Sequence, residues 1–449
     1  MRSTAGSRRG AASAPRCPTA QPLPQRRTDN VTTSLSPDLA RLADPAVRPD
    51  PYGVLRTLRE ASPYTDPASG IVVVGRRSDC EAVLRNPKVS SDRQGSGITT
   101  VPQMPNLMNL DAPDHTRLRR LAGKAFKPRL VQQWRPRIEE IVRELLTDIA
   151  AGENTADLVS AFAYPLPVRV ICDMLGVPRE DHPVFEKWAR SIAYTVDPQL
   201  VPGRLSTEVV QEVEEARAGF VGYFGRLIAE RRHTPRADVL SELISAEEQG
   251  DQLTESELII TCILLLVAGH ETTANLILNG ILGLLRHPGQ LRLLRERPEL
   301  AEAAVEEVLR YDAPAQMITR IAREPFTIGD TPVTPGTPLL VLLAAANRDP
   351  DVHRDPDTFD ISRGDPGHLG FAAGPHFCLG SVLARLEGSI ALNAFAQAFV
   401  EPRLDAESLR YRPHVAVRGP DRMRVSFKEI RVDAVRVTGT SERSVASRG

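Results

Sequence analysis

Apolar residues recur at helical spacing along most of the chain. This pattern predicts helices over residues 51–61, 130–150, 165–176, 207–232, 255–287, 298–311 and 381–399. Short β-like runs lie at 70–75, 337–343 and 423–428. Proline and glycine punctuate 312–380, which is typical of a loop-rich stretch. We find no internal repeat or long linker, so the pattern predicts a mainly α fold with small β-sheets (α+β), built as a single large domain.

Both ends of the chain differ from this pattern. The first 28 residues carry six arginines, four prolines and no acidic residue, a composition that buries too little apolar surface to offset the entropy of ordering. Arg8-Arg9 lacks the apolar stretch that follows in a twin-arginine export signal. We therefore expect a disordered basic tail, a folded domain and a loose C-terminal tail over residues 1–36, 37–430 and 431–449.

Composition narrows the class of protein. The chain has 449 residues, 41% of them apolar and 25% charged, with a net charge of −1. Nucleic-acid binders are usually basic overall, so a general nucleic-acid partner is not expected. The five cysteines are scattered without CxxC spacing, which argues against a zinc ribbon or a disulfide framework and favours a reducing, cytoplasmic location.

The longest apolar segment, 258–285, carries a polar interruption at its centre. Thr254 and Glu257 form a capping box before it, which predicts a helix start. A carboxylate at bilayer depth is costly, so Glu271 favours a buried central helix over a membrane span. The sequence around His270 also resembles the zinc motif HExxH, but Ala274 replaces the second histidine and excludes that site.

The interruption itself, residues 269–273, reads GHETT. A glycine in mid-helix costs about 1 kcal/mol against alanine, and a buried carboxylate needs a partner. Two structural explanations stay open: Gly269 marks a close helix crossing, or Thr272 donates to the carbonyl of Ala268. The functional explanation is a polar site placed inside an apolar helix.

A second constellation, residues 371–380, reads FAAGPHFCLG and precedes the predicted helix 381–399. A lone cysteine is most often a small buried hydrophobe. Here Cys378 stands before a helix start, where free amides and the helix dipole favour a thiolate. Gly374 and Gly380 permit close approach of a flat ligand, and His376 offers a donor to an anionic group. A thiolate on an open loop is what an axial haem ligand requires.

With these motifs the chain resembles a cytochrome P450 of the soluble, bacterial, ferredoxin-dependent type. The loop pattern FxxGxHxCxG, the helix sequence AGHETT, an ExxR helix and an HxxxR pair occur in the family's order, and the resemblance spans roughly residues 40 to 428. One departure is Ala372, where the family commonly has glycine.

The resemblance implies haem b as cofactor and assigns a role to each matching residue. Cys378 would be the axial ligand of the iron. Gly269 would widen the helix for O₂, Thr272 would hydrogen-bond O₂, and Glu271 would relay protons. The propionates would be held by His115, Arg119, Arg320 and His376. A buried structural network would comprise Glu307, Arg310 and Arg363. The walls of the substrate pocket would include Leu264, Val267, Ala268 and Ile318.

The implied activity is a monooxygenase that hydroxylates or epoxidises an apolar small molecule, as expected for a secondary-metabolite intermediate. No GxGxxG fingerprint occurs, so electrons are expected from a separate ferredoxin and its reductase, and no membrane anchor is expected. Arg117, Arg120 and Lys124 share one helix face, which serves either solubility or docking of an acidic ferredoxin. Two rival functions are a peroxide-driven enzyme of the same fold and a non-catalytic homologue that activates a partner enzyme.

Overall fold

A computed structural model describes residues 35–93, 104–193, 206–248, 251–364, 367–412 and 414–435. The predicted basic tail and the loose C-terminal tail fall almost wholly outside these ranges. The prediction of a mainly α fold with small sheets is confirmed.

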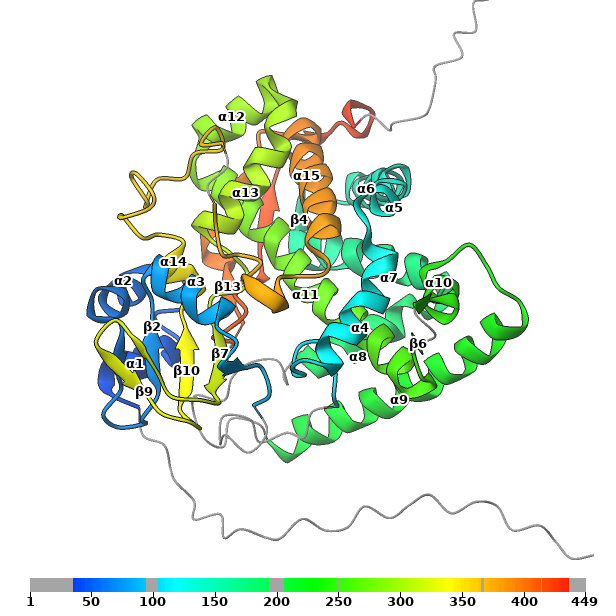
Figure 1. The fold of residues 1–449 in the computed structure, drawn as a ribbon. Helices are drawn as coiled ribbons and strands as arrows, with labels where there is room; N and C mark the ends of the chain where they lie inside the picture. Colours follow the sequence, from blue (N-terminus) through cyan, green and yellow to red (C-terminus); the bar gives the residue numbers. More distant parts are fainter. Residues whose placement is uncertain are drawn as a thin grey trace, which may run out of the picture.

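Helices make up most of the described chain (Figure 1). They are α1 (Pro37–Ala40), α2 (Tyr52–Ala61), α3 (Arg77–Arg85), α4 (Asp114–Ala122), α5 (Pro128–Gln132), α6 (Arg135–Ala150), α7 (Pro165–Leu175), α8 (His182–Ala193), α9 (Thr207–His233), α10 (Val239–Ser245), α11 (Glu255–Arg286), α12 (Pro288–Glu296), α13 (Ala301–Tyr311), α14 (Leu343–Ala346) and α15 (Ser381–Ala398). The predicted helix over 130–150 is interrupted between α5 and α6, where Pro136 stands in the first turn of α6.

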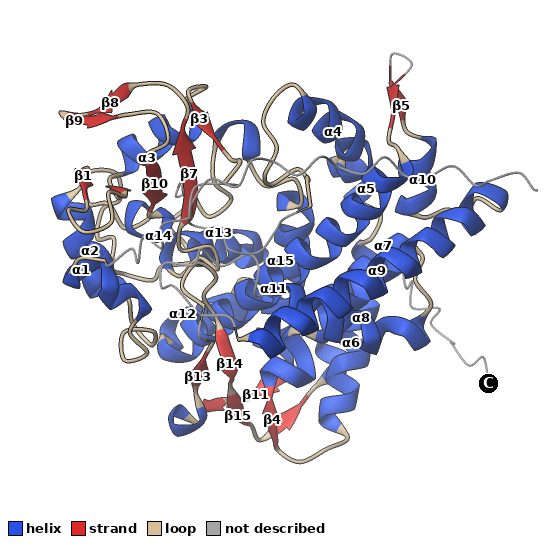
Figure 2. Ribbon diagram, turned by 90° about the horizontal axis from the view of Figure 1, so that it is seen from below, coloured by secondary structure: helices blue, strands red, loops and turns tan. Residues whose placement is uncertain are grey.

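The strands are short and form several small sheets, most of which lie at the upper left and at the lower edge of Figure 2. The largest has the order β1-β2-β10-β7-β3, from Tyr64–Thr65, Val72–Val74, Pro338–Val341, Ile318–Ala322 and Val89–Ser90. Its β2 and β10 run parallel, and its other pairs are antiparallel.

The remaining strands pair in sheets of two or three. Their ranges are β4 (Thr155–Asp157), β5 (Glu247–Glu248), β6 (Asp251–Gln252), β8 (Phe326–Ile328), β9 (Thr331–Val333), β11 (Phe399–Val400), β12 (Arg403–Leu404), β13 (Arg410–Tyr411), β14 (Pro420–Arg422), β15 (Arg424–Ser426) and β16 (Glu429–Ile430). The three-stranded sheet has the order β12-β15-β4, so the C-terminal strands pack on the segment before α7.

Helix α11 runs through the centre of the helical part and packs against α7, α8, α9, α13 and α15. Its capping box is formed as predicted, with Thr254 and Glu257 each accepting from the other's backbone amide. The helix is long and apolar enough to cross a membrane, yet 61% of its most apolar window is buried inside the domain. It is therefore the core helix, and it sets the positions of the residues around it.

Candidate functional site

The loop before α15 is held in shape by its own backbone. The amide of Cys378 donates to the carbonyl of Phe371 at 3.0 Å, and the amide of Gly380 donates to the Cys378 thiol. Gly374 has φ +72°, and a Cβ placed there would stand 2.3 Å from the carbonyl oxygen of Leu84. Only glycine fits this position, and the close approach fixes the loop against the end of α3.

Ala372 occupies the position where the family commonly has glycine, and its φ is +58°. A left-handed conformation costs a residue with a Cβ about 1–2 kcal/mol. The loop keeps its shape in spite of this strain, because Ala372 lies inside the turn that the hydrogen bond from the Cys378 amide to the Phe371 carbonyl closes.

Cys378 differs from the other cysteines in the described ranges. Cys80, Cys172 and Cys262 are fully buried, and burial raises the pKa of each thiol. Cys378 is partly exposed. Burial raises its pKa as well, but the Gly380 amide and the charges of Arg119 and Arg385 oppose this. Coordination to iron removes the thiol proton outright, so these groups would stabilise the bound thiolate.

The middle of α11 presents one open stripe. Between Thr261 and Leu284, a stretch described throughout, every residue is buried except Leu264, Ala268, Gly269 and Thr272. These positions recur at helical spacing, so they lie along one side of the helix. No atom of another element lies within 4 Å of a Cβ built on Gly269, so this glycine does not mark a close helix crossing. Three of the four belong to the motif AGHETT.

Thr272 donates to the carbonyl of Ala268 at 2.7 Å, which is the local bond considered from the sequence. α11 is a continuous α-helix through Gly269, so the widening expected there is not present in this conformation. The hydroxyl oxygen of Thr272 keeps acceptor capacity toward the open stripe.

Two other residues of the interruption lie off the stripe. Glu271 is buried, and its Oε1 accepts from Arg412 Nη1 at 3.1 Å. His270 is buried against Tyr164, with 4.7 Å between the ring centroids. Val267, expected in the pocket wall, is buried in the main core, whereas Ile318 on β7 is only half-buried. The stripe is therefore narrower than the sequence indicated.

Four cationic or neutral donors from three separate segments of the sequence influence one another here: His115, Arg119, Arg320 and His376. The rings of His115 and His376 lie 4.0 Å apart. Burial lowers the pKa of His115, and the charge of Arg119 lowers it further. Burial, then Arg320, lowers the pKa of His376 to about 4. Burial and the charge of Arg93 lower the pKa of Arg320 to about 10. The donors thus destabilise one another's charge, which is the electrostatic signature of an anion site.

The residues present fit a haem. His115 Nε2 is buried without a protein partner in the described chain. Asp111 is the carboxylate acting on this cluster, and it already accepts from Ser90 and Arg323. Two propionates would satisfy the orphaned nitrogen and compensate the clustered positive charge. Arg119 also donates to the carbonyl of Phe377, which ties the cluster to the Cys378 loop.

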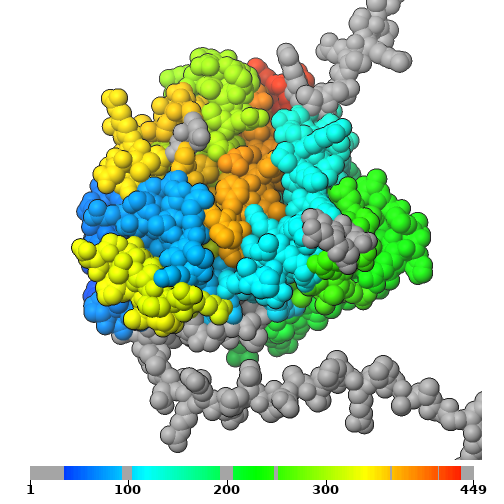
Figure 3. Space-filling model, viewed as in Figure 1, coloured from blue at the N-terminus to red at the C-terminus, as the bar shows by residue number. Residues whose placement is uncertain are grey.

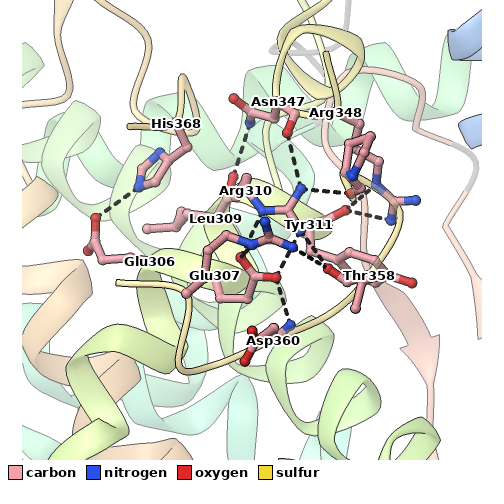
Figure 4. A network of polar contacts seen from close by, with 12 residues as sticks. Glu306, Glu307, Leu309, Arg310, Tyr311, Asn347, Arg348, Thr358, Asp360 and His368 are labelled. Carbon is pink, nitrogen blue, oxygen red and sulfur yellow. Dashed lines mark hydrogen bonds and ion pairs between the residues drawn. The ribbon is translucent and has the colours of Figure 1, made fainter. Parts of the chain in front are cut away.

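Glu307, Arg310 and Arg363 form the network expected from the ExxR helix. Figure 4 shows its buried centre, Glu307 and Arg310. Arg310 donates to both carboxylate oxygens of Glu307 at 2.8 Å. Arg363 Nε lies 3.4 Å from Glu307 Oε2, and the amide of Asp360 donates to Oε1 at 2.8 Å. Arg310 also donates to the carbonyl of Thr358, so the network fixes the loop after α14 to α13.

A second network beside the Cys378 loop has no sequence motif. His368 Nε2 and the Arg385 guanidinium both donate to Glu306, at 2.9 Å and 2.6 Å. Burial raises the pKa of Glu306, but these hydrogen bonds outweigh it and bring the pKa to about 2. Arg385 lies over the ring of Phe371 at 4.6 Å. A bidentate partner for Arg385 is set by tertiary contact, so no local spacing could indicate it.

The basic stripe expected on α4 is partly an internal contact. Arg117 pairs with Glu257, the capping residue of α11, and lies 3.5 Å from Asp251. Arg120 lies 3.9 Å from the same Asp251. Arg117 therefore ties α4 to the start of α11, and it is not an open docking residue.

The comparisons with known proteins agree with this geometry. The family model described as Cytochrome P450 matches residues 67–427. The biotin biosynthesis cytochrome P450 of Bacillus subtilis is 39% identical over 84% of this chain and 96% of that protein. The cytochrome P450 monooxygenase PikC of Streptomyces venezuelae is 37% identical over 92% of this chain and all of that protein.

Solved structures agree as well. Ligand-free CYP164A2 of Mycobacterium smegmatis superposes with a TM-score of 0.79 at 43% identity, covering 87% of this chain and 99% of that one. P450BioI, solved in complex with a ligated acyl carrier protein, gives a TM-score of 0.78 at 36% identity over 86% and 99%. With a thiol on a shaped loop, a donor cluster for two carboxylates and an open stripe on the core helix, the chain belongs to the cytochrome P450 family of haem-dependent monooxygenases.

Proposed function

We propose that the chain uses a haem-thiolate centre and electrons from a separate ferredoxin to hydroxylate or epoxidise an apolar small molecule. The observation that carries this proposal is the open stripe of α11, because it leaves Gly269 exposed and Thr272 half-buried in a stretch of helix whose other sides are buried. α15, which follows the Cys378 loop, packs directly against α11, so the thiol and the stripe belong to one region.

Bound haem would supply reduction and activation of O₂, and the chain would supply position and protons. Cys378 would ligate the iron, and the donor cluster around His115 would hold the propionates. Gly269 leaves the stripe free of a side chain. Thr272 Oγ1 would accept one hydrogen bond while its own hydroxyl proton is donated to the Ala268 carbonyl. Glu271 would give a proton toward the stripe and recover one from solvent.

The first experiment tests the ligand. The reduced, carbon-monoxide-bound protein should show the far-red Soret band of thiolate ligation, and Cys378→Ala should abolish it. A thiolate-type spectrum in Cys378→Ala would overturn the assignment. Cys80→Ala is the matched control, because that thiol is buried away from the loop.

The substrate is proposed to be an apolar intermediate of secondary metabolism. Leu264, Ala268 and Ile318 offer apolar surface at half-buried positions. Among the relatives, PksS of Bacillus subtilis is named a polyketide biosynthesis cytochrome P450 and is 35% identical over 85% of this chain. A panel of macrolactones, steroids and fatty acids, titrated by the substrate-induced spectral shift, tests the class. Ala268→Phe should reduce the affinity for a hit at least tenfold, whereas unchanged affinity would move the pocket elsewhere.

The ferredoxin is proposed to dock over the Cys378 loop. Phe377, next to Cys378, is 39% exposed, and Lys127 and Arg129 are exposed at the start of α5. α5 packs against α15, and Gly123 of the preceding turn lies against Leu379. In Figure 3 the orange surface of this loop and α15 lies between the blue surface around α3 and the cyan surface of α4. An apolar centre with a basic rim suits an acidic partner.

Charge reversal separates docking from folding. Lys127→Glu with Arg129→Glu should slow ferredoxin-supported turnover, most at low ionic strength, and leave peroxide-supported turnover unchanged. Arg403→Glu on β12 is the control for added negative charge. Equal loss of both activities would refute the docking site. If peroxide alone supported full turnover, the alternative of a peroxide-driven enzyme would be correct.

We also propose a cytoplasmic location, where reduced ferredoxin is available.

A further inference from the structure

Glu271 is buried on α11, and its carboxylate forms an ion pair with Arg412. The side chains of Glu271 and Arg412 are 9% and 7% exposed. Arg412 Nη1 lies 3.1 Å from Glu271 Oε1, while Arg412 Nε lies 3.5 Å from Oδ1 of Asp421. The Asp421 side chain is 57% exposed. Arg412 thus spans from the buried carboxylate on α11 to a surface carboxylate on β14.

The other titratable groups that face this pair are His270, Tyr164 and Arg190. Burial, then the charges of Arg412 and Arg190, lowers the pKa of His270 to about 3, so that ring stays neutral. Burial, then the charge of Glu271, raises the pKa of Tyr164. Arg412 lies over the Tyr164 ring at 4.5 Å, and Arg190 lies over the same ring at 5.3 Å. Arg412 is therefore the cation in direct contact with the Glu271 carboxylate.

Several buried polar atoms near this pair have no hydrogen-bond partner in the described chain: Tyr164 Oη, His270 Nε2 and both amide atoms of Asn275. Asn275 is one helical turn beyond Glu271. Buried polar groups of this kind are normally satisfied by internal water. A cleft of about 30 Å³ beside Arg412, Gln316 and Gly419 has room for a water molecule. The orphaned atoms mark where a proton-carrying water chain would run.

We propose that Arg412 is a positioning residue that controls proton delivery, exchanging between Glu271 and Asp421 to connect the buried carboxylate with solvent. This inference rests on the proposed function of Glu271. When Arg412 moves toward Asp421, the carboxylate loses its cation in a buried site, and taking a proton from the water chain becomes favourable. Glu271 then gives that proton toward Thr272 and pairs with Arg412 again. One proton enters and one leaves, and no electron moves.

The test compares Arg412→Gln, Arg412→Lys and Asp421→Asn with Asp405→Asn, an exposed acid on the same C-terminal segment. Arg412→Gln should lower kcat about tenfold and raise the solvent deuterium isotope effect on O₂ consumption, with KM within about twofold. Arg412→Lys keeps the charge and should recover most of kcat. Asp421→Asn should lower kcat two- to threefold. The control should match the wild type.

A second measurement needs no turnover. Infrared spectroscopy of substrate-free Arg412→Gln should show a protonated carboxyl band that is absent from the wild type and from Arg412→Gln combined with Glu271→Gln. Absence of this band, or equal loss of kcat in the Lys and Gln variants without an isotope effect, would overturn the inference. If instead the wild type lacks the thiolate spectrum, the proposed function itself fails, and the two failures are distinguishable.

Discussion

Gly269 lies in the middle of a buried helix, where glycine lowers the stability of the helix and no packing contact requires it. A glycine in a helix interior is about 0.8–1 kcal/mol less favourable than alanine. Apart from its chain neighbours and the adjacent backbone of its own helix, no atom lies within 4 Å of the added methyl group at this position, so no clash offsets the gain. Gly269→Ala should therefore stabilise the folded chain by about 1 kcal/mol.

Gly280 lies three turns later on the same helix and makes the matched comparison. An added Cβ there would stand 2.7 Å from Leu392 Cδ2 and 3.2 Å from Val308 Cγ2. Overpacking of this kind costs about 1–3 kcal/mol, which outweighs the gain in helix propensity. Gly280→Ala should destabilise the chain by about 1 kcal/mol, so the two variants differ in sign.

Differential scanning calorimetry at fixed haem content measures the difference. For a domain of this size 1 kcal/mol corresponds to about 1 °C, so the two midpoints should be separated by about 2 °C. Gly269→Ala should also divert electrons from product to peroxide, because its methyl group stands on the stripe beside Thr272. A lower midpoint for Gly269→Ala would refute the packing argument. If a stabilised Gly269→Ala variant formed as much product per electron consumed as the wild type, the argument that the glycine serves the reaction would be refuted.

Four further predictions concern single residues. Ala372→Gly should raise the free energy of unfolding by about 0.5–1 kcal/mol, measured by calorimetry, because relief of the left-handed strain exceeds the added entropy of glycine. Glu307→Gln should destabilise by about 3–5 kcal/mol and reduce retained haem, because it leaves Arg310 buried without its carboxylate. The pKa of Glu306 falls from 4.5 to about 2 on folding, so its contribution to stability is complete above pH ~4.5 and is lost as pH falls toward 2; Glu306→Gln should flatten that part of an acid-unfolding curve. Thr272→Ala should keep the substrate-induced spectral shift and lower the ratio of product to electrons consumed, as measured by product and peroxide assays.

Most of the longer helices were predictable, whereas several helices of 12 residues or fewer were not. The sequence predicts α7, α9, α11, α13 and α15 to within a few residues, because each carries a long apolar face. It misses α3, α8, α10 and α12. α12 buries only Leu291 and Leu294, so its stability comes from packing on its neighbours more than from a local pattern.

The site residues also fall into two groups, those that the local sequence predicts and those that only the tertiary structure reveals. Residues on the Cys378 loop and on the α11 stripe are recognisable because the backbone that shapes them is local, and the spacing of glycines, histidine and cysteine records that shape. The charges that act on them are contributed from elsewhere in the fold. Glu306 and Arg385 are 79 residues apart, and Arg412 and Glu271 are 141 residues apart.

Arg117 and Arg412 show why charge patterns on one element are ambiguous. Arg117 belongs to a regular basic stripe on α4, which indicates an open surface, yet it pairs with the carboxylate that caps α11. Arg412 lies in no pattern, yet it is buried against Glu271. A side chain this long reaches partners on any element packed nearby, so helical spacing fixes its direction and not its partner. Residues that would touch the haem can thus be predicted from local sequence. Their ion-pair and hydrogen-bond partners can be identified only from the packing of distant segments.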